Sequence, residues 1–379
     1  MIVEQRIWTS TGGWQPAKAT LQDAQVVLVF GGRDALSHHA HFMQVQKDYP
    51  SARFLGGSTA GEIAGMRVLD DSIVVTAIRF DKATVASAEV DLGATEGSKA
   101  AGIRLAKAIP AAGLRHVLVV SDGAAVNGSE LVSGMLEALP KGVMVTGGLA
   151  ADGARFEKTL TVGQRGAAPR RLVAVGLYGP GLQVGYGSLG GWDPFGPLRI
   201  VTKSRGNVLL ELDGKPALGL YKQYLGEHAK GLPATGLLFP LEVRANAGAA
   251  GRGLTRTILA VSEAEQSLTF AGDIPQDSVV RLMKANFDRL VDGAQGAAEA
   301  SSVALGGSRP ELALLISCVG RKLVLKQRVE EELEAVQEVL GKGVPMAGFY
   351  SNGEICPAAP NADCDLHNQT MTITTLREA

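Results

Sequence analysis

The chain has 379 residues, enough for two ordinary domains, and its 46% hydrophobic and 20% charged residues are typical of a packed globular protein. Its 37 basic and 38 acidic residues nearly cancel and form no basic stripe, which argues against nucleic acid and anionic membranes as partners. No run of apolar residues is long enough to span a membrane, the N-terminus lacks a signal-peptide core, and three cysteines, an odd number, do not suggest a disulfide framework. These features predict a cytoplasmic protein.

The predicted elements repeat three times along the chain. Copy one has an apolar strand and glycines at 26–33, a helical stretch, and a glycine-rich turn at 52–63. The same pattern returns in copy two at 117–123 and 143–153, and in copy three at 314–321 and 344–355. Each copy is followed by a further strand, at 73–80, 172–178 and 371–376. Short Val- and Ile-rich strands joined by helices favour a buried, largely parallel sheet.

This pattern predicts an α/β protein of internally repeated β-α-β-β units, with mixed, mostly parallel sheets in two related halves. The region between copies two and three, 185–275, differs in character from the copies. We place the boundary after residue 218, so that the two halves are residues 1–218 and 219–379. Ligands of such sheets bind beyond the carboxyl ends of the strands, where the glycine-rich turns lie.

Two G-E-I turns stand at matching positions of copies one and three, Gly61-Glu62 and Gly353-Glu354. Their carboxylates could face a shared pocket and bind an amine or a water network, or each could cap a nearby backbone amide. Two arginines, Arg33 and Arg321, follow the opening strands of the same copies. A guanidinium there could bind a ligand carboxylate or phosphate, or pair with a glutamate of its own copy.

The same turns supply the other candidate ligand-binding residues, which are Gly57, Ser58, Thr59, Tyr350, Ser351 and Asn352. The G-x-G-x-x-G match at 185–190 is not followed by a helix, so it offers no helix N-terminus to a pyrophosphate. Nucleophile-elbow, Walker and zinc-protease motifs are absent from the sequence. We therefore favour a binding protein over an enzyme. The alternative is a small-molecule hydrolase or lyase with Glu62 or Glu354 as general base.

The C-terminal stretch concentrates soft potential ligands, Cys356, Cys364 and His367. They could bind zinc or haem iron, with His367 as the axial candidate. Their irregular spacing is not a zinc signature, however, and His367 could simply anchor the loop against the final strand.

Five segments together resemble the FIST family of bacterial sensory proteins: G-G-S-T-A-G-E-I (56–63), G-G-L-A-A-D-G (147–153), S-C-V-G-R (317–321), G-F-Y-S-N-G-E-I (348–355) and H-N-Q-T (367–370). The resemblance runs from about Gln25 to the end of the chain. It implies an intracellular module that binds a small ligand and signals to a histidine kinase or a cyclic-di-nucleotide enzyme.

Some FIST members bind haem and sense nitric oxide, so the resemblance also implies haem b as a candidate cofactor; others are thought to bind amino-acid-like metabolites. The chain departs from the family at Gly57, where members often carry cysteine, and no kinase or cyclase segment is recognisable in it. We therefore expect a sensor with a pocket at the turns of copies one and three and a separate signalling partner. The oligomeric state stays open.

Overall fold

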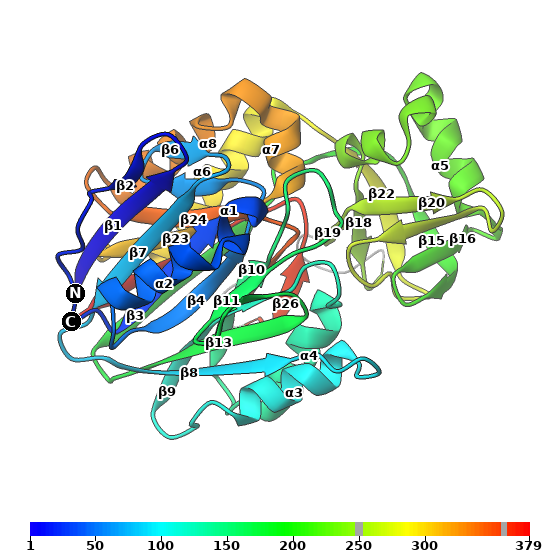
Figure 1. The fold of residues 1–379 in the computed structure, drawn as a ribbon. Helices are drawn as coiled ribbons and strands as arrows, with labels where there is room; N and C mark the ends of the chain where they lie inside the picture. The colour runs from blue at the N-terminus through cyan, green and yellow to red at the C-terminus, as the bar shows by residue number, and fades with distance from the viewer. Residues whose placement is uncertain (247–252, 358–361) are drawn as a thin grey trace.

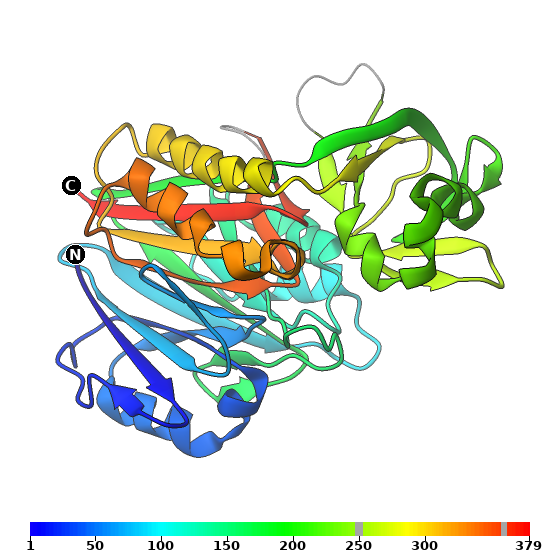
Figure 2. The same ribbon diagram turned by 90° about the horizontal axis from the view of Figure 1, so that it is seen from above.

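The computed structural model describes residues 1–246, 253–357 and 362–379. They form two parts, a body that contains the three copies and an insert, residues 193–284, that projects from one side of it (Figure 1). The two ends of the chain lie next to each other on the far side of the body (Figure 2). None of the described helices has the length and apolar character that crossing a membrane requires.

The three copies share one plan, in which a leading strand precedes the first strand, and a helix, a second strand, a short hairpin and a third strand follow. Copy one comprises β1 (Ile2–Thr9), β2 (Gly13–Gln15), β3 (Val26–Gly31), α1 (Arg33–Ser37), α2 (His39–Asp48), β4 (Arg53–Ser58), β5 (Glu62–Ala64), β6 (Arg67–Leu69) and β7 (Ile73–Arg79). Copy two comprises β8 (Thr84–Asp91), α3 (Ser98–Lys107), β9 (Leu114–Ser121), α4 (Gly128–Ala138), β10 (Met144–Leu149), β11 (Thr161–Gly163), β12 (Gly166–Ala168) and β13 (Arg171–Tyr178). Copy three comprises β14 (Leu182–Leu189), α6 (Phe287–Ala304), β23 (Leu312–Cys318), α7 (Val319–Leu325), η3 (Lys326–Arg328), α8 (Glu331–Leu340), β24 (Met346–Ser351), β25 (Gly353–Pro357), β26 (Cys364–His367) and β27 (Met371–Glu378).

Strand pairing confirms the α/β class and the repeated unit but corrects the expected direction of the strands. Within each copy the first and second strands run parallel, as in β3–β4, β9–β10 and β23–β24. The third strand lies antiparallel to the first, and the leading strand antiparallel to the third. Helices connect strands that run in the same direction, whereas the chain returns to the antiparallel third strand through a hairpin. The sheets are therefore mixed, and not mostly parallel.

The hairpins are exchanged between copies in a closed ring. β5 of copy one pairs with β24 of copy three, β25 of copy three pairs with β10 of copy two, and β11 of copy two pairs with β4 of copy one. Each sheet of the body therefore contains strands from two copies. Three equivalent amides close the ring: the backbone N–H groups of Ala60, Ala151 and Asn352 each donate to a carbonyl of another copy, at 2.8, 2.7 and 3.2 Å.

A glycine at the same place in each second strand allows the copies to fold alike. A Cβ atom added to Gly56, Gly147 or Gly348 would lie 1.7 to 1.8 Å from a carbonyl oxygen of the adjacent first strand. No side chain fits there, which explains why these three glycines recur in the repeat.

The cores follow the same symmetry. One apolar cluster lies between the sheets at the centre and takes residues from all three copies, among them Phe30, Val120, Ile316 and Phe349. A separate cluster lies on the outer side of each sheet, under the helices of that copy.

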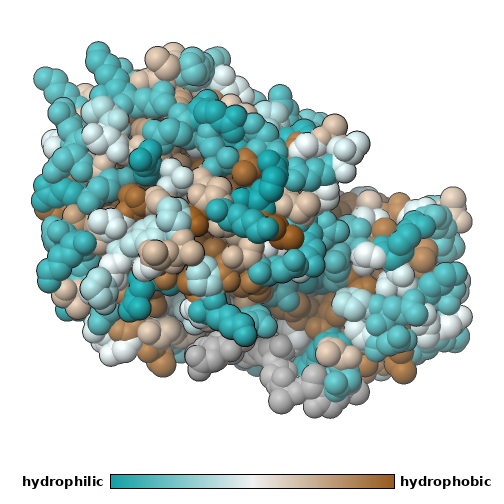
Figure 3. All heavy atoms as spheres, turned by 90° about the horizontal axis from the view of Figure 1, so that it is seen from below, coloured by the Kyte–Doolittle hydropathy of each residue, from teal (hydrophilic) through white to brown (hydrophobic). Residues whose placement is uncertain are grey.

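The insert interrupts copy three between β14 and α6 and has its own core. It comprises β15 (Asp193–Arg205), β16 (Val208–Leu212), β17 (Lys215–Pro216), α5 (Ala217–Leu225), η1 (Gly226–Gly231), η2 (Ala234–Leu238), β18 (Leu241–Arg244), β19 (Leu254–Arg256), β20 (Ile258–Ser262), β21 (Ser267–Phe270) and β22 (Val279–Lys284). The boundary expected at residue 218 falls within α5, inside the insert. Seen from below, the surface is hollowed where the insert meets the body, and apolar side chains gather there (Figure 3).

Candidate functional site

The carboxylate of Glu62 is enclosed by donors of its own copy. Its side chain is 1% exposed and accepts hydrogen bonds from Thr59 Oγ1 and from the backbone N–H and Oγ of Ser72, the last two at 3.2 and 2.7 Å. Burial raises the pKa of Glu62 to about 7. The carboxylate thereby joins the turn before β5 to the start of β7.

Glu354 repeats this arrangement in copy three. It is 0% exposed and accepts from Ser351 Oγ at 2.6 Å and from the backbone N–H and Oγ1 of Thr370 at 3.2 and 2.9 Å. Burial raises the pKa of Glu354 to about 8. The two glutamates lie in different sheets, because β5 and β25 were exchanged to different copies, and they share no hydrogen-bond partner. The structure therefore places them in two matching internal clusters, not around one pocket.

Copy two has a glycine, Gly153, at the glutamate position and uses two buried aspartates in its place. Asp122 accepts from the N–H groups of Ala124, Ala125 and Arg170 at 2.8, 2.7 and 2.7 Å. It thereby holds the turn between β9 and α4 in a fixed shape.

The second aspartate, Asp152, orders the segment that follows β10. It accepts from the backbone N–H groups of residues 156, 157 and 158 at 2.9 to 3.0 Å, and from Arg33 Nη1 at 3.1 Å. Arg33 was predicted as a ligand contact; it begins α1 of copy one and reaches across to the loop of copy two. Its guanidinium thus positions residues that line a cavity.

That cavity, of about 790 Å³, lies between described residues of the body and the insert, and it is larger than a second cavity between them, of about 700 Å³. The body contributes the turn after β9, residues 123–128, together with Leu149, Leu323 and Asn352. The insert contributes 231–234, Leu237, 258–259 and 270–272. Because β9, β10 and β24 end here, the cavity lies beyond the carboxyl ends of strands, where ligands of α/β sheets bind. Its volume is that of ordinary small-molecule sites.

Asn352 is the predicted ligand-binding residue that lines this cavity. Its Nδ2 is 3.5 Å from the carbonyl oxygen of Gly123, at the limit of a hydrogen bond, and its Oδ1 is buried without a partner. The remaining predicted residues serve the framework around it. Ser58 Oγ accepts the N–H of Leu160 at 2.8 Å, and Gly57 pairs with Thr161 where β11 joins β4.

Arg321 and Tyr350 belong to a buried ion pair of copy three. Both the arginine and its partner Glu332 are 0% exposed; Arg321 Nε donates to Glu332 at 2.8 Å, and Tyr350 Oη donates to the same carboxylate at 3.1 Å. Arg321 also donates to the carbonyl of Leu290 at 2.7 Å and to that of Gly190, on the segment that leads into the insert. This is the internal pairing that the sequence left open as the alternative to ligand contact.

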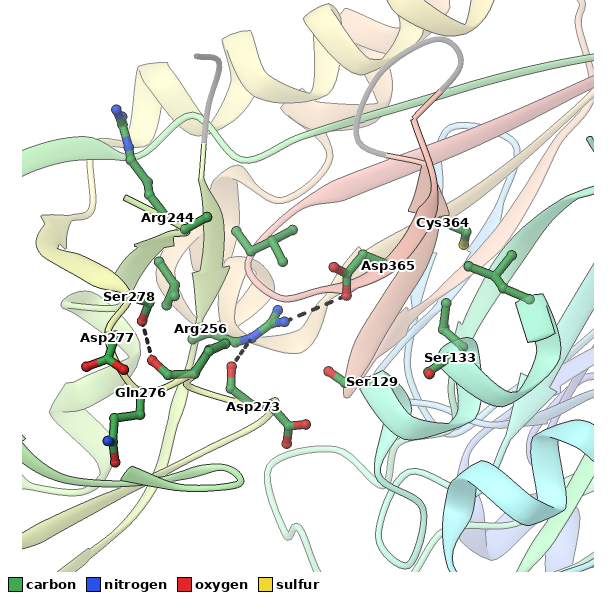
Figure 4. A pocket seen from close by; sticks show the side chains of 16 residues that line it. Ser129, Ser133, Arg244, Arg256, Asp273, Gln276, Asp277, Ser278, Cys364 and Asp365 are labelled. Atoms are coloured by element: carbon green, nitrogen blue, oxygen red, sulfur yellow. Dashed lines mark hydrogen bonds and ion pairs between the residues drawn. The ribbon is translucent and has the colours of Figure 1, made fainter. Parts of the chain in front are cut away.

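The smaller cavity, of about 700 Å³, is lined by residues of α4 together with β18, β19 and β26 (Figure 4). Arg256 of β19 points across it toward Asp365 of β26, with Ser129 and Ser133 of α4 beyond (Figure 4). The guanidinium is occupied, however: Nη1 donates to the carbonyl of Leu366 at 2.7 Å, Nε to that of Asp273 at 3.2 Å, and Nη2 lies 3.8 Å from Asp365. Arg256 therefore fastens the insert to the body, and we place the candidate site in the larger cavity.

Cys356, Cys364 and His367 do not form a metal centre. Cys364 lies on the opposite face of its hairpin from His367, where its thiol donates to the carbonyl of Val145 at 3.0 Å. Burial raises the pKa of the Cys356 and Cys364 thiols, which keeps both protonated. The Nε2 atom of His367 lies 2.8 Å from the carbonyl oxygen of Cys356. No group of three ligating side chains occurs in the described residues, which exclude 358–361 of this stretch. These residues do not fit haem.

The sequence did not indicate the turn at 123–128 or the segments of the insert as binding residues. Their signal was weak, because alanines, glycines and isolated leucines carry no chemistry until the fold brings them together.

Comparison with known proteins gives the family. Residues 25–215 match the FIST N domain and residues 217–357 match the FIST C domain. An uncharacterised protein of Mycobacterium tuberculosis is 27% identical over 228 residues, which are 58% of this chain and 57% of that protein. One of Mycobacterium bovis is 29% identical over 230 residues, with the same shares. The chain thus aligns with little more than half the length of these relatives.

Among solved structures, a cyanuric acid hydrolase from A. caulinodans aligns with 100% of this chain and 99% of its own, at 10% identity and a TM-score of 0.35. Another cyanuric acid hydrolase gives 10% identity and a TM-score of 0.37 over the same shares. Scores this low support no statement about activity. The two domain matches, by contrast, cover most of the chain, which therefore belongs to the FIST family of sensory ligand-binding domains.

Proposed function

We propose that this chain is the ligand-binding part of a sensory system and that the larger cavity holds its small-molecule ligand. The observation that supports this most is that the walls of the cavity come from two separately packed parts, the body and the insert. A ligand that contacts both walls favours one arrangement of the two parts over others, which is what a sensor requires.

Among the described residues, the polar contacts that join the insert to the body include three side-chain hydrogen bonds. Asn127 Nδ2 donates to Asp273 Oδ1 at 3.1 Å, Arg256 Nη1 to the carbonyl of Leu366 at 2.7 Å, and Gln369 Nε2 to that of Leu237 at 3.4 Å. Such contacts can shift when a ligand enters. We propose that this shift is read by a separate cytoplasmic partner, such as a histidine kinase or a cyclic-di-nucleotide enzyme.

The test is a thermal-shift screen of metabolites, with each hit repeated on variants that fill the cavity. Ala125 and Ala234 are exposed and line opposite walls, so Ala125→Trp and Ala234→Trp occupy the space without disturbing a core. Ala100, exposed on α3 and away from the cavity, provides the matched control Ala100→Trp. We expect compounds that stabilise the wild type and the control but neither filled variant. Compounds that stabilise the filled variants as much as the wild type would contradict the proposal. So would a panel in which no compound stabilises the wild type.

One observation favours a second candidate, a hydrolase or lyase with Glu62 or Glu354 as general base, since pKa values of about 7 and about 8 suit proton transfer near neutral pH. Against it, neither carboxylate lines either large cavity. Turnover of a panel compound that disappears in Glu62→Gln or Glu354→Gln would favour the enzyme.

A further inference from the structure

The larger cavity offers almost no charge to a ligand. Glu157 is the one charged side chain among the described residues that line it, and no lysine, arginine or histidine is among them. Glu157 is 68% exposed and pairs with Arg33 Nη1 at 3.4 Å, so it stands at the mouth and not in the interior. An anion that entered would lose its hydration without meeting a cation, which is costly.

The start of α4 does not compensate for this, although helix N-termini often bind anions. The N–H groups of Ser129 and Glu130 already donate to Asn127 Oδ1 at 3.0 and 3.2 Å. In the turn before the helix, Asp122 takes the N–H groups of Ala124 and Ala125. These four amides are therefore not available to a phosphate or carboxylate, and the carboxylate of Asp122 beside them repels an anion.

What the cavity does offer is apolar surface and amide side chains. Leu149 and Leu323 of the body face Leu232, Leu237 and Ile258 of the insert across it. Apolar surface on both sides favours a ligand that is itself largely apolar, by about 25 cal/mol for each Å² removed from water.

The side chain that we expect to hydrogen-bond the ligand is that of Asn352, which lines the cavity. Its carboxamide has an unpartnered Oδ1 and a long contact from Nδ2 to the carbonyl of Gly123, so the described residues leave it undersatisfied. Leaving such a group without a partner costs about 1–3 kcal/mol, which a hydrogen-bonding ligand recovers. A turn about the terminal side-chain bond presents either end of the amide to the ligand.

We propose that the ligand is an uncharged, mainly apolar molecule with one hydrogen-bonding head group, a carboxamide or ketone, that binds Asn352. This inference rests on the proposed function, since it concerns the same cavity. It excludes haem from the cavity, because haem carries carboxylates, and it excludes free amino acids, which carry both charges.

The experiment uses four naphthalene derivatives substituted at one ring position: a carboxamide, a methyl compound, a carboxylate and a methylammonium compound. Each displaces the uncharged fluorescent naphthalene dye prodan from the intact protein. We expect the carboxamide to bind at least about tenfold more tightly than the carboxylate, and more tightly than the methylammonium compound. It should also bind more tightly than the methyl compound, by about fivefold or more.

Two substitutions separate the head-group contact from general effects on the fold. Asn352→Leu should weaken the carboxamide by about fivefold or more and leave the methyl compound at least as tight. Asn352→Asp, which keeps the shape of the side chain, should strengthen the methylammonium compound and weaken the carboxylate. A variant that had merely unfolded would lose prodan and all four probes together. If Asn352→Leu unfolds in this way, Asn352→Asp alone tests the head-group contact.

The outcomes distinguish the two proposals. A carboxylate that binds as tightly as the carboxamide overturns the inference of an uncharged ligand. Equal affinities of the carboxamide and methyl compounds in the wild type overturn the role of Asn352. If prodan and all probes fail to bind the wild type, or bind equally to Ala125→Trp, the cavity is not the ligand site and the proposed function fails with it.

Discussion

Replacing Glu354 by glutamine should make the protein less sensitive to pH. The carboxyl group is buried, and its pKa rises from 4.5 to about 8 on folding because burial disfavours the charged form. Between these two values the folded protein holds a proton that the unfolded chain releases. The free energy of unfolding therefore falls as pH rises from about 4.5 to about 8, and this contribution levels off above that.

The size of the effect follows from the shift. Each pKa unit corresponds to about 1.4 kcal/mol, so Glu354 alone accounts for about 3 to 5 kcal/mol across that range. This is a large share of the 5–15 kcal/mol that stabilises a typical domain. Glutamine matches the protonated acid: it can donate to Ser351 Oγ, whose own hydroxyl then donates to the carbonyl of Ser317 at 3.3 Å, and accept from Thr370.

The assay is urea unfolding at several pH values from 5.5 to 8.5, for wild type and Glu354→Gln. We expect the variant to gain on the wild type by about 1.4 kcal/mol per pH unit up to pH 8. Glu334→Gln, on the exposed face of α8, is the matched control and should run parallel to the wild type. If Glu354→Gln also ran parallel, the carboxyl group would be charged when folded and the account of its environment would be wrong.

Three further predictions follow. Gly348→Ala should destabilise the protein by at least about 3 kcal/mol, because the added Cβ would lie 1.7 Å from a carbonyl oxygen. Gly113→Ala, in open space at φ +74°, should cost only about 1 kcal/mol. Thermal unfolding compares the two variants, and equal losses of stability would contradict the close approach at Gly348. Arg33→Gln should weaken prodan binding several-fold, because it loosens the cavity wall at 154–157. Arg165→Gln, which breaks a more exposed ion pair outside the wall, should leave prodan binding unchanged, and fluorescence titration compares the two variants. His367 should not bind haem iron, because its ring is buried and hydrogen-bonded to a carbonyl. In protein produced with haem, His367→Ala should therefore leave the visible spectrum unchanged. A Soret band that is present in the wild type and lost in the variant would refute this.

The sequence predicted the repeated unit because its signals are local. An apolar first strand, an amphipathic helix and a glycine where the second strand meets the first recur in each copy, and each can be recognised within about thirty residues. The exchange of hairpins could not be predicted in this way. β5 is three residues long, and nothing in Glu62–Ala64 indicates that its partner is β24 of copy three.

The candidate site was predicted only in part, for a similar reason. Asn352 stood in a recognised motif, but Ile258 and Phe270 lie in an insert whose position over the body no local pattern reveals. The matched glutamates suggested one shared pocket, whereas the exchange carries Glu62 and Glu354 into different sheets. Cys364 and His367 are close in sequence but face opposite sides of β26, which an alternating strand requires once its bounds are known.

The closed exchange of hairpins also has a consequence for how the protein is made. Ile63 pairs with Gly348, so the hairpin of copy one has no sheet to join until the last copy leaves the ribosome. At about 5–20 residues per second, that wait is on the order of 15–60 s. During it the β5–β6 hairpin and the free edge of β10 are open to pairing with other chains. We expect the nascent chain to depend on chaperones until copy three completes the ring.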